Sequence, residues 1–372
     1  MNMEKETLAM GIPQLLLNKV ILINGTLFVA LIAMEQSANE HIFMSLIFLA
    51  LSLVLLIKSA DFFIEGAKGL ALRAGLPEVV IGLTIVSIGT SLPEILVTSA
   101  AAVDIPKNPE IADLAIGGIY GSVLVQISLI LGVVVAIQGV KIRPSWLKRD
   151  GMIMLASIAL LTVFLVTDST ITRIEGFILA LLYCVYVAWL LNHRGEILEE
   201  EGVSFEGEVS GSKWSTASYI FMVVVGLVLA LFAAHYLVTI ASDIAIKLKV
   251  PHAVVGTTIS GLGTSLPELT IALLAAKKSE GVAIGTLIGS NITDPLFSIG
   301  IAAMVHELPL TSASYGLTMY IIVPMTFICT LFALYFMRSK YELKKTEGYI
   351  LILVYLAFLV LLYAAHQDII PV

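Results

Sequence analysis

The chain has 372 residues, of which 58% are hydrophobic and 13% are charged, and its formal net charge at pH 7 is −7. A soluble domain carries about 25% charged residues, so this composition excludes the ordinary soluble classes and indicates a polytopic helical membrane protein. It also excludes a transmembrane β-barrel, whose strands alternate apolar and polar residues, and no basic patch suggests a nucleic-acid partner.

Long apolar runs follow one another along the chain, each near the ~20 residues that a membrane-spanning helix needs. Residues 13–34 form the first run. Because no small-residue cleavage pattern follows it, we expect this run to be an additional span rather than a signal peptide. The core spans are then predicted at about 42–64, 79–103, 112–138, 151–167, 174–191, 217–246, 253–276, 282–304, 315–337 and 347–364. The predicted fold class is therefore an all-α polytopic membrane protein with ten core helices and an additional N-terminal helix.

One hexapeptide occurs twice. The sequence GTSLPE at residues 89–94 returns unchanged at residues 263–268, an offset of 174 residues. Two related halves with five spans each must enter the membrane in opposite orientations, which predicts an inverted repeat. The expected organisation is an N-terminal segment at 1–38, a first repeat at 39–191, an acidic cytoplasmic loop at 192–216 and a second repeat at 217–372.

Basic residues in the loops set the expected orientation. The connections after the odd-numbered core spans contain 14 Lys and Arg residues, and the intervening connections contain 4. By the positive-inside rule the first set faces the cytoplasm, which places the central loop there and the C-terminus outside. The glutamates of this loop lack the spaced Asp, Asn and Gly residues of a Ca²⁺ loop, so the loop is expected to be a solvated linker.

Three acidic residues are expected at membrane depth. Glu94 and Glu268 end the two GTSLPE copies, and Asp294 ends the run GSNITD at residues 289–294. A carboxylate there costs about 2.5–3.5 kcal/mol on insertion scales, and no basic residue lies near the middle of these helices to form a structural ion pair. We therefore interpret the three as the centre of a cation site, with a formal charge that three Na⁺, or one Ca²⁺ with a proton, would neutralise.

Hydroxyl and carbonyl oxygens accompany these acids at helical spacing. Pro93 and Pro267 cannot donate a hydrogen bond to the carbonyls of Gly89 and Gly263, which leaves further oxygen atoms available. An all-oxygen site suits hard cations such as Na⁺ and Ca²⁺, although any single hydroxyl could instead bond back to its own helix or join two helices. The candidate metal ligands are Ser87, Thr90, Ser91, Glu94, Ser122, Gln126, Gly261, Thr264, Ser265, Glu268, Ser290 and Asp294.

Other polar residues are interpreted as structural. Asp61 and Glu65 lie among lysines, which indicates an interfacial helix end, and His235 and His306 are isolated. The serines have no paired histidine, which argues against an intramembrane hydrolase, and no GxxxxGK[ST] run suggests a nucleotide. The chain is therefore predicted not to be an enzyme.

The two GTSLPE helices, the GSNITD run and the run ADFFIEGA at residues 60–67 resemble the cation/Ca²⁺ exchanger superfamily, and most closely its prokaryotic Na⁺/Ca²⁺ exchangers. The resemblance implies ten core helices in two inverted repeats, with one Ca²⁺ site and neighbouring Na⁺ sites, and electrogenic exchange. It implies that Glu94 and Glu268 are bidentate Ca²⁺ ligands, and that the carbonyls of Ser87 and Gly261 complete the site. Gln126 departs from the Asn or Asp usual in the family, and Val123 from the usual Asn.

The function predicted from these features is secondary antiport of Na⁺ and Ca²⁺ by alternating access. A proton-coupled or K⁺-coupled Ca²⁺ antiporter and, from another class, a cation channel with acidic pore ligands stay open. The expected partners are membrane lipid and the two substrate ions, with no nucleotide, nucleic acid or resident cofactor. The expected location is the cell membrane, and a monomer is compatible with the sequence.

Overall fold

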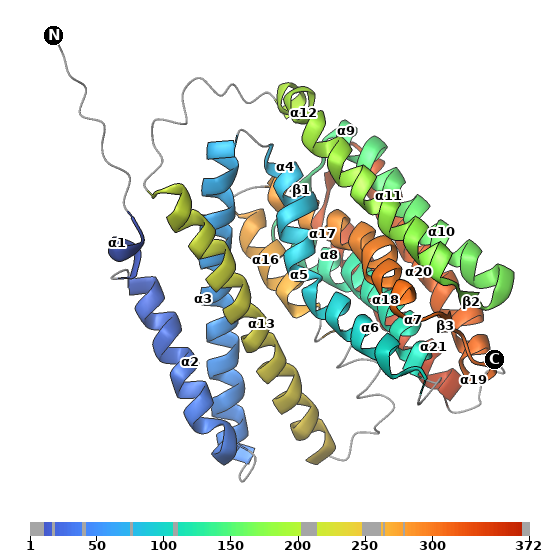
Figure 1. Ribbon diagram of the computed structural model, residues 1–372, viewed down its shortest axis with the longest axis horizontal. Helices are drawn as coiled ribbons and strands as arrows, with labels where there is room; N and C mark the ends of the chain where they lie inside the picture. The colour runs from blue at the N-terminus through green and yellow to red at the C-terminus, as the bar shows by residue number, and fades with distance from the viewer. Residues whose placement is uncertain are drawn as a thin grey trace.

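The computed structural model describes residues 11–16, 19–38, 42–74, 77–106, 111–201, 214–247, 262, 265–277 and 280–366. These residues are almost entirely helical, as the composition predicts. α2 (Lys19–Ala38), α3 (Ile42–Ala74) and α13 (Thr216–Lys247) lie together at one end of the molecule, and the remaining long helices form a bundle beside them (Figure 1).

α3 continues well beyond the boundary expected near residue 64. It runs without a break to Ala74, because no proline interrupts it and its small residues pack closely on α13. A Cβ atom at Gly66 would lie 2.6 Å from Cβ of Met222, so the two helices approach at van der Waals contact. Glu65 therefore lies inside a helix, where its Oε1 accepts a 3.3 Å hydrogen bond from Nε1 of Trp214. The helix does not end here as predicted, but the apolar stretch within it that is long enough to cross a membrane, Phe43–Ala67, ends close to the predicted span boundary.

The helix that carries the first GTSLPE copy is broken. Its parts are α4 (Glu78–Ile81), the π-helical segment η1 (Gly82–Val86), α5 (Ser87–Thr90) and α6 (Leu92–Asp104). The axis bends by 43° at the break, where Ser91 leaves helical geometry at φ −78° and ψ 3°. Pro93 lies in the first turn of α6, where its missing N–H leaves no helical hydrogen bond unmade.

The second copy has the same local backbone where it is described. Ser265, at φ −90° and ψ 7°, precedes α16 (Leu266–Ala276), and Pro267 lies in its first turn. The same six residues therefore produce the same turn and helix start in both places.

Several other spans are composites of α-helix and π-helix. Besides η1, the described part of the chain has four π-helical segments that each lie between two α-helices. The further elements are α1 (Ile12–Leu16), α7 (Ile111–Leu124), η2 (Val125–Ile130), α8 (Leu131–Gln138), α9 (Pro144–Trp146), η3 (Leu147–Gly151), α10 (Met152–Asp168), α11 (Arg173–Asn192), α12 (Arg194–Glu201), α17 (Glu280–Thr293), η6 (Asp294–Ser298), α18 (Ile299–Val305), α19 (Ser312–Leu317), η7 (Thr318–Ile322), α20 (Val323–Arg338) and α21 (Lys345–His366).

Within the described ranges, 8 helices are long and apolar enough to cross a membrane, or 9 if the pair bent at Ser91 is one span. The predicted span at 253–276 is described only at residue 262 and from residue 265 onward. In the N-terminal segment the apolar helix Ile21–Met34 is shorter than the ~20 residues of a typical span, so the additional span stays a prediction.

Two short antiparallel sheets connect loops of the first half of the chain to loops of the second half. β1 (Val140–Lys141) pairs with β4 (Glu342–Leu343), and β2 (Thr170–Ile171) pairs with β3 (Leu308–Pro309). β1 precedes α10 and β2 follows it, so the two sheets lie at opposite ends of this helix.

Glycines bring the helices of the bundle into backbone contact. A Cβ atom at Gly285 of α17 would lie 2.6 Å from the Val79 carbonyl oxygen and 3.0 Å from Cα of Gly82. Gly132 approaches Gly348, and Gly300 approaches Gly176. A Cβ atom at Gly132 would lie 2.9 Å from the Gly348 carbonyl oxygen, and a Cβ atom at Gly300 would lie 2.9 Å from the Gly176 carbonyl oxygen. Small residues at such crossings are the usual means of packing membrane helices. They fix α17 directly against the broken helix.

Candidate functional site

The structure gathers the predicted ligands at the centre of the bundle, with the exception of Gly261 and Thr264, which lie outside the described residues. They come from the break between α5 and α6, from α7 and η2, from the start of α16, and from α17 and η6. The buried side chains are Ser87, Thr90, Ser91, Glu94, Ser122, Gln126, Ser265, Glu268, Ser290 and Asp294.

Ser122 lies at the centre of this cluster. Its hydroxyl is 3.3 Å from Oε1 of Glu94, 3.2 Å from Oδ2 of Asp294 and 3.2 Å from Oγ of Ser265. Gln126, one helical turn along, donates a 2.9 Å hydrogen bond from Nε2 to the same hydroxyl. Because a serine has one proton, it cannot donate to both carboxylates at once. The cluster therefore contains more acceptors than donors.

Asp294 is buried at the start of η6 and uses only part of its hydrogen-bonding capacity. Its Oδ2 accepts from Ser122 and, at 3.2 Å, from Nε2 of Gln126. Ser91 and Ser298 also lie against this carboxylate, yet their hydroxyls and the second oxygen, Oδ1, make no hydrogen bond among the described residues. Oδ1 of Asp294 therefore has no protein donor among the described residues.

Glu268 is the least satisfied of the three acids. It is 0% exposed, and neither carboxylate oxygen accepts a hydrogen bond in the part of the chain that the structure describes. It interacts electrostatically with Glu94 and Asp294, and Thr90 lies beside it. A buried carboxylate that has no donor and is repelled by two neighbouring carboxylates is costly, and a cation coordinated between the three would remove both penalties.

The carboxylates alone do not complete a metal site. In the described ranges no group of three or more His, Cys, Asp and Glu side chains is placed to hold a metal ion. A cation here would need the hydroxyl and carbonyl oxygens as well, which is the ligand chemistry of Na⁺ and Ca²⁺. The Ser87 carbonyl accepts a 2.9 Å hydrogen bond from the Ser91 N–H and a 3.3 Å hydrogen bond from the Thr90 hydroxyl, so a cation would take the place of the Thr90 proton.

Direct hydroxyl contacts join the first GTSLPE helix to α17. Oγ of Ser87 lies 3.3 Å from Oγ1 of Thr293, and Oγ1 of Thr90 lies 3.3 Å from Oγ of Ser290. Both contacts depend on the approach of α17 at Gly285. The fold therefore places one helix from each half of the chain side by side at the site.

Sequence reasoning missed two residues near this cluster. Thr293 lies inside the GSNITD run. It could have been identified if the sequence had shown that Ser87 faces this run across the helix contact. Tyr183 of α11 accepts a 3.0 Å hydrogen bond from Thr293, and no polar pattern surrounds it in the sequence to indicate this role. Of the weaker candidates, His306 contacts the Glu307 carbonyl away from the cluster, and the side chain of His235 is outside the described residues.

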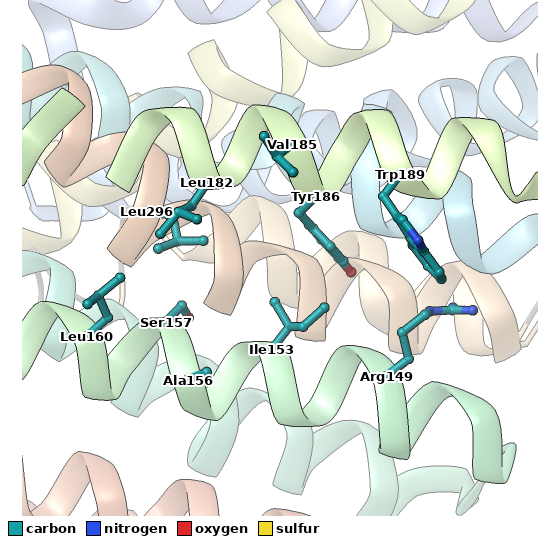
Figure 2. Close-up of a pocket in the computed structure, with 10 residues that line it drawn as sticks. All are labelled: Arg149, Ile153, Ala156, Ser157, Leu160, Leu182, Val185, Tyr186, Trp189 and Leu296. Atoms are coloured by element: carbon teal, nitrogen blue, oxygen red, sulfur yellow. The ribbon is translucent and has the colours of Figure 1, made fainter. Parts of the chain in front are cut away.

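A separate cavity of about 440 Å³ lies between α10 and α11 (Figure 2). Arg149 and Trp189 lie at one end, and Leu160, Leu182 and Leu296 at the other. Its lining contains no carboxylate, and the adjacent Asp150 is bound by Arg149 and Tyr186, which both line the cavity. The cavity therefore lacks the carboxylate ligands of a cation site.

The chain matches the sequence model of the sodium/calcium exchanger protein family over residues 44–192 and 218–364. It is 30% identical over 358 residues to the sodium/calcium exchanger MaX1 of Methanosarcina acetivorans, covering 85% of this chain and 97% of that protein. It is also 30% identical over 326 residues to the putative antiporter CaxA of Alkalimonas amylolytica, covering 86% and 98%. These matches confirm the resemblance that the repeated helices indicate.

Solved structures of the sodium-calcium exchanger NCX_Mj have the same fold. The structure soaked with zero Na⁺ and Ca²⁺ superposes with a TM-score of 0.69 at 25% identity, covering 85% of this chain and 98% of that one. A second, soaked with 2.5 mM Na⁺ and 0.1 mM Ca²⁺, gives a TM-score of 0.65 at 26% identity, covering 82% and 94%.

Proposed function

Because this chain belongs to the sodium/calcium exchanger protein family, we propose that it is a secondary antiporter that exchanges Na⁺ for Ca²⁺ by alternating access. The family is one of multi-pass membrane transporters and not of enzymes. One observation carries the proposal: the buried carboxylates of Glu94, Glu268 and Asp294 converge from both halves of the chain among hydroxyl groups. Such a site is costly unless a cation occupies it during the cycle.

Ca²⁺ takes six to eight oxygen ligands at about 2.3–2.6 Å. We assign Glu94 and Glu268 as its bidentate ligands, because each begins a helix immediately after the same turn. Asp294 and Gln126 are assigned chiefly to Na⁺. The flanking ligands are the side chains of Thr90, Ser91, Ser122, Thr264, Ser265 and Ser290 and the carbonyls of Ser87 and Gly261.

The proposed architecture is ten core helices in two inverted repeats, at 39–191 and 217–372, joined by a cytoplasmic loop at 192–216. The pairing of the strands supports it, since a two-fold axis that exchanges β1 with β3 and β2 with β4 maps each sheet onto the other. The helix contacts at Gly132 with Gly348 and at Gly300 with Gly176 exchange in the same way. The positive-inside rule then places the C-terminus outside, in the cell membrane.

Asp294→Asn is expected to weaken the dependence of transport on Na⁺ more than the binding of Ca²⁺. The neutral amide of Gln126 occupies the matching place in the first half, so the two positions cannot act as an equivalent carboxylate pair. The measurement is ⁴⁵Ca²⁺ uptake by proteoliposomes over a range of internal Na⁺, together with equilibrium ⁴⁵Ca²⁺ binding. A loss of Ca²⁺ binding at unchanged Na⁺ dependence would reverse the assignment.

Transport is expected to be electrogenic. A site with three carboxylates is neutralised by three Na⁺ in one half-cycle, whereas one Ca²⁺ leaves one charge uncompensated in the other. Moving one elementary charge is worth about 2.3 kcal/mol per 100 mV, so an inside-negative potential should accelerate Na⁺ entry. Valinomycin can set K⁺ potentials of either sign with pH clamped on both sides, and equal rates at both signs would exclude three-for-one exchange.

The experiment that tests the function is ⁴⁵Ca²⁺ uptake into proteoliposomes under imposed Na⁺, K⁺ or H⁺ gradients. A Na⁺ gradient alone should drive accumulation of Ca²⁺ against its own gradient. Accumulation driven only by H⁺ or K⁺ would identify one of the alternative antiporters. Ca²⁺ movement that needs no counter-ion and only follows its own gradient would identify a channel.

A further inference from the structure

Tyr183 reaches the cation cluster from α11, a helix that supplies none of the predicted ligands. Its side chain is 2% exposed, and its ring packs on Phe297 of η6 at a centroid distance of 5.0 Å. Its hydroxyl lies 3.0 Å from Oγ1 of Thr293. The tyrosine thus contacts the residue that immediately precedes Asp294.

Thr293 extends this contact to the broken helix. Its Oγ1 is 3.3 Å from Oγ of Ser87 and 2.9 Å from the Gly289 carbonyl, while Ser87 lies 2.8 Å from the Leu83 carbonyl. The hydroxyl protons of Thr293 and Ser87 serve all of these contacts and a further one from Ser87 to the Thr84 carbonyl at 3.2 Å, so the contacts cannot all be hydrogen bonds at the same moment. Thr293 donates to Tyr183, and in this orientation its oxygen can accept the Ser87 proton across the contact between the two helices. The tyrosine oxygen therefore orients the Thr293 hydroxyl that joins the two helices.

The symmetry-related set of contacts keeps the tyrosine and lacks the hydroxyl of Thr293. Tyr183 lies seven residues after Gly176, and Tyr355 lies seven residues after Gly348, the glycine that takes the matching place on α21. Alignment of the GS pairs at residues 121–122 and 289–290 places Val125 opposite Thr293. Tyr355 is also buried, at 4% exposure, and α21 packs on η2, which Val125 begins.

We propose that Tyr183 is a positioning residue of the cation site, which acts through Thr293 to hold Ser87 against the helix that carries Asp294. The proposal rests on the proposed function, because it assigns a role in ion binding to this cluster. The Ser87 carbonyl is one of the assigned ligands, so a shift of Ser87 changes its distance from the bound cation. The role belongs to one of the two symmetry-related parts of the site, since Val125 takes the place of Thr293 in the other part and has no hydroxyl.

The test compares Tyr183→Phe with the matched control Tyr355→Phe. Each substitution removes one hydroxyl from a buried tyrosine and keeps the ring, so a purely structural effect should be similar in both. Loss of one hydrogen bond is expected to raise the Ca²⁺ concentration for half-maximal ⁴⁵Ca²⁺ uptake about 3- to 10-fold in Tyr183→Phe. The maximal rate should be nearly unchanged, and Tyr355→Phe should behave as wild type.

Thr293→Val gives position 293 of the second half the residue that its counterpart in the first half, Val125, has, and it should reproduce the same shift. The double variant with Tyr183→Phe should shift no further, because both substitutions interrupt one chain of contacts. A wild-type half-maximal concentration in Tyr183→Phe, or an equal shift in Tyr355→Phe, would overturn the proposal.

Equilibrium ⁴⁵Ca²⁺ binding to the purified protein separates this proposal from the function on which it rests. If wild-type protein binds Ca²⁺ but does not exchange it for Na⁺, the antiport assignment fails, and the binding constants of the variants still test Tyr183. Thermal unfolding of the Ca²⁺-free proteins controls for stability. If both tyrosine variants lose the same stability and show the same shift in Ca²⁺ binding, this result also counts against the proposal.

Discussion

Replacing Glu94 or Glu268 by glutamine is expected to abolish Ca²⁺ transport while the protein stays folded. The amide keeps the volume of the side chain and removes the charge that compensates for the dehydration of a divalent cation. Loss of one partner from a buried charge pair costs about 3–5 kcal/mol, which corresponds to a fall of more than about 100-fold in affinity. Removal of a repelling charge from an empty cluster should, in contrast, leave the fold unharmed.

The measurement is ⁴⁵Ca²⁺ uptake into proteoliposomes at equal amounts of reconstituted protein, with size-exclusion profiles to show folding. Glu280→Gln is the matched control, because Glu280 is exposed at the start of α17, the helix that leads to Asp294. The control should transport at the wild-type rate. Wild-type uptake by either Glu94→Gln or Glu268→Gln would remove that residue from the site.

Gly285→Leu is expected to eliminate transport by separating two site helices. A Cβ atom at this position would already meet the Val79 carbonyl at 2.6 Å and the Leu83 nitrogen at 3.1 Å, and backbone atoms cannot move aside as a flexible side chain can. Overpacking of this kind costs about 1–3 kcal/mol or more. The contacts of Ser87 with Thr293 and of Thr90 with Ser290 depend on the same crossing and should be lost.

Gly118→Leu is the control for this substitution, since a Cβ atom at Gly118 would have no neighbour within 4 Å. It should fold and transport normally. Thermal unfolding in detergent and ⁴⁵Ca²⁺ uptake should both distinguish the two variants. Normal transport by Gly285→Leu would mean that the site tolerates a wider separation of these helices.

The sequence predicts the class, the spans and most of the cluster for physical reasons that act locally. Acids in apolar runs are rare, so Glu94, Glu268 and Asp294 stand out without any structural information. The exact repeat of GTSLPE identifies both helices, and the described parts of the two copies have the same turn at Ser91 and Ser265. Each of these signals depends on residues close together in the chain.

What the sequence does not predict arises from contacts between distant segments. The contact of Tyr183 with Thr293 joins residues 110 positions apart, and an isolated tyrosine in an apolar helix carries no local sign of a polar partner. The end of α3 is likewise set by its packing on α13 rather than by a break in its own sequence.

The two short sheets restrict how such a molecule can open to either side of the membrane. Each sheet ties a loop of the first half to a loop of the second, and together they fasten the two halves at both ends of α10. If the halves rocked against each other as rigid bodies, one of these ties would have to open in every half-cycle. α3 and α13 carry neither strand, and they contact each other more than they contact the tied bundle (Figure 1). The two sheets therefore oppose rigid-body rocking of the halves, whereas neither sheet ties α3 or α13 to the bundle.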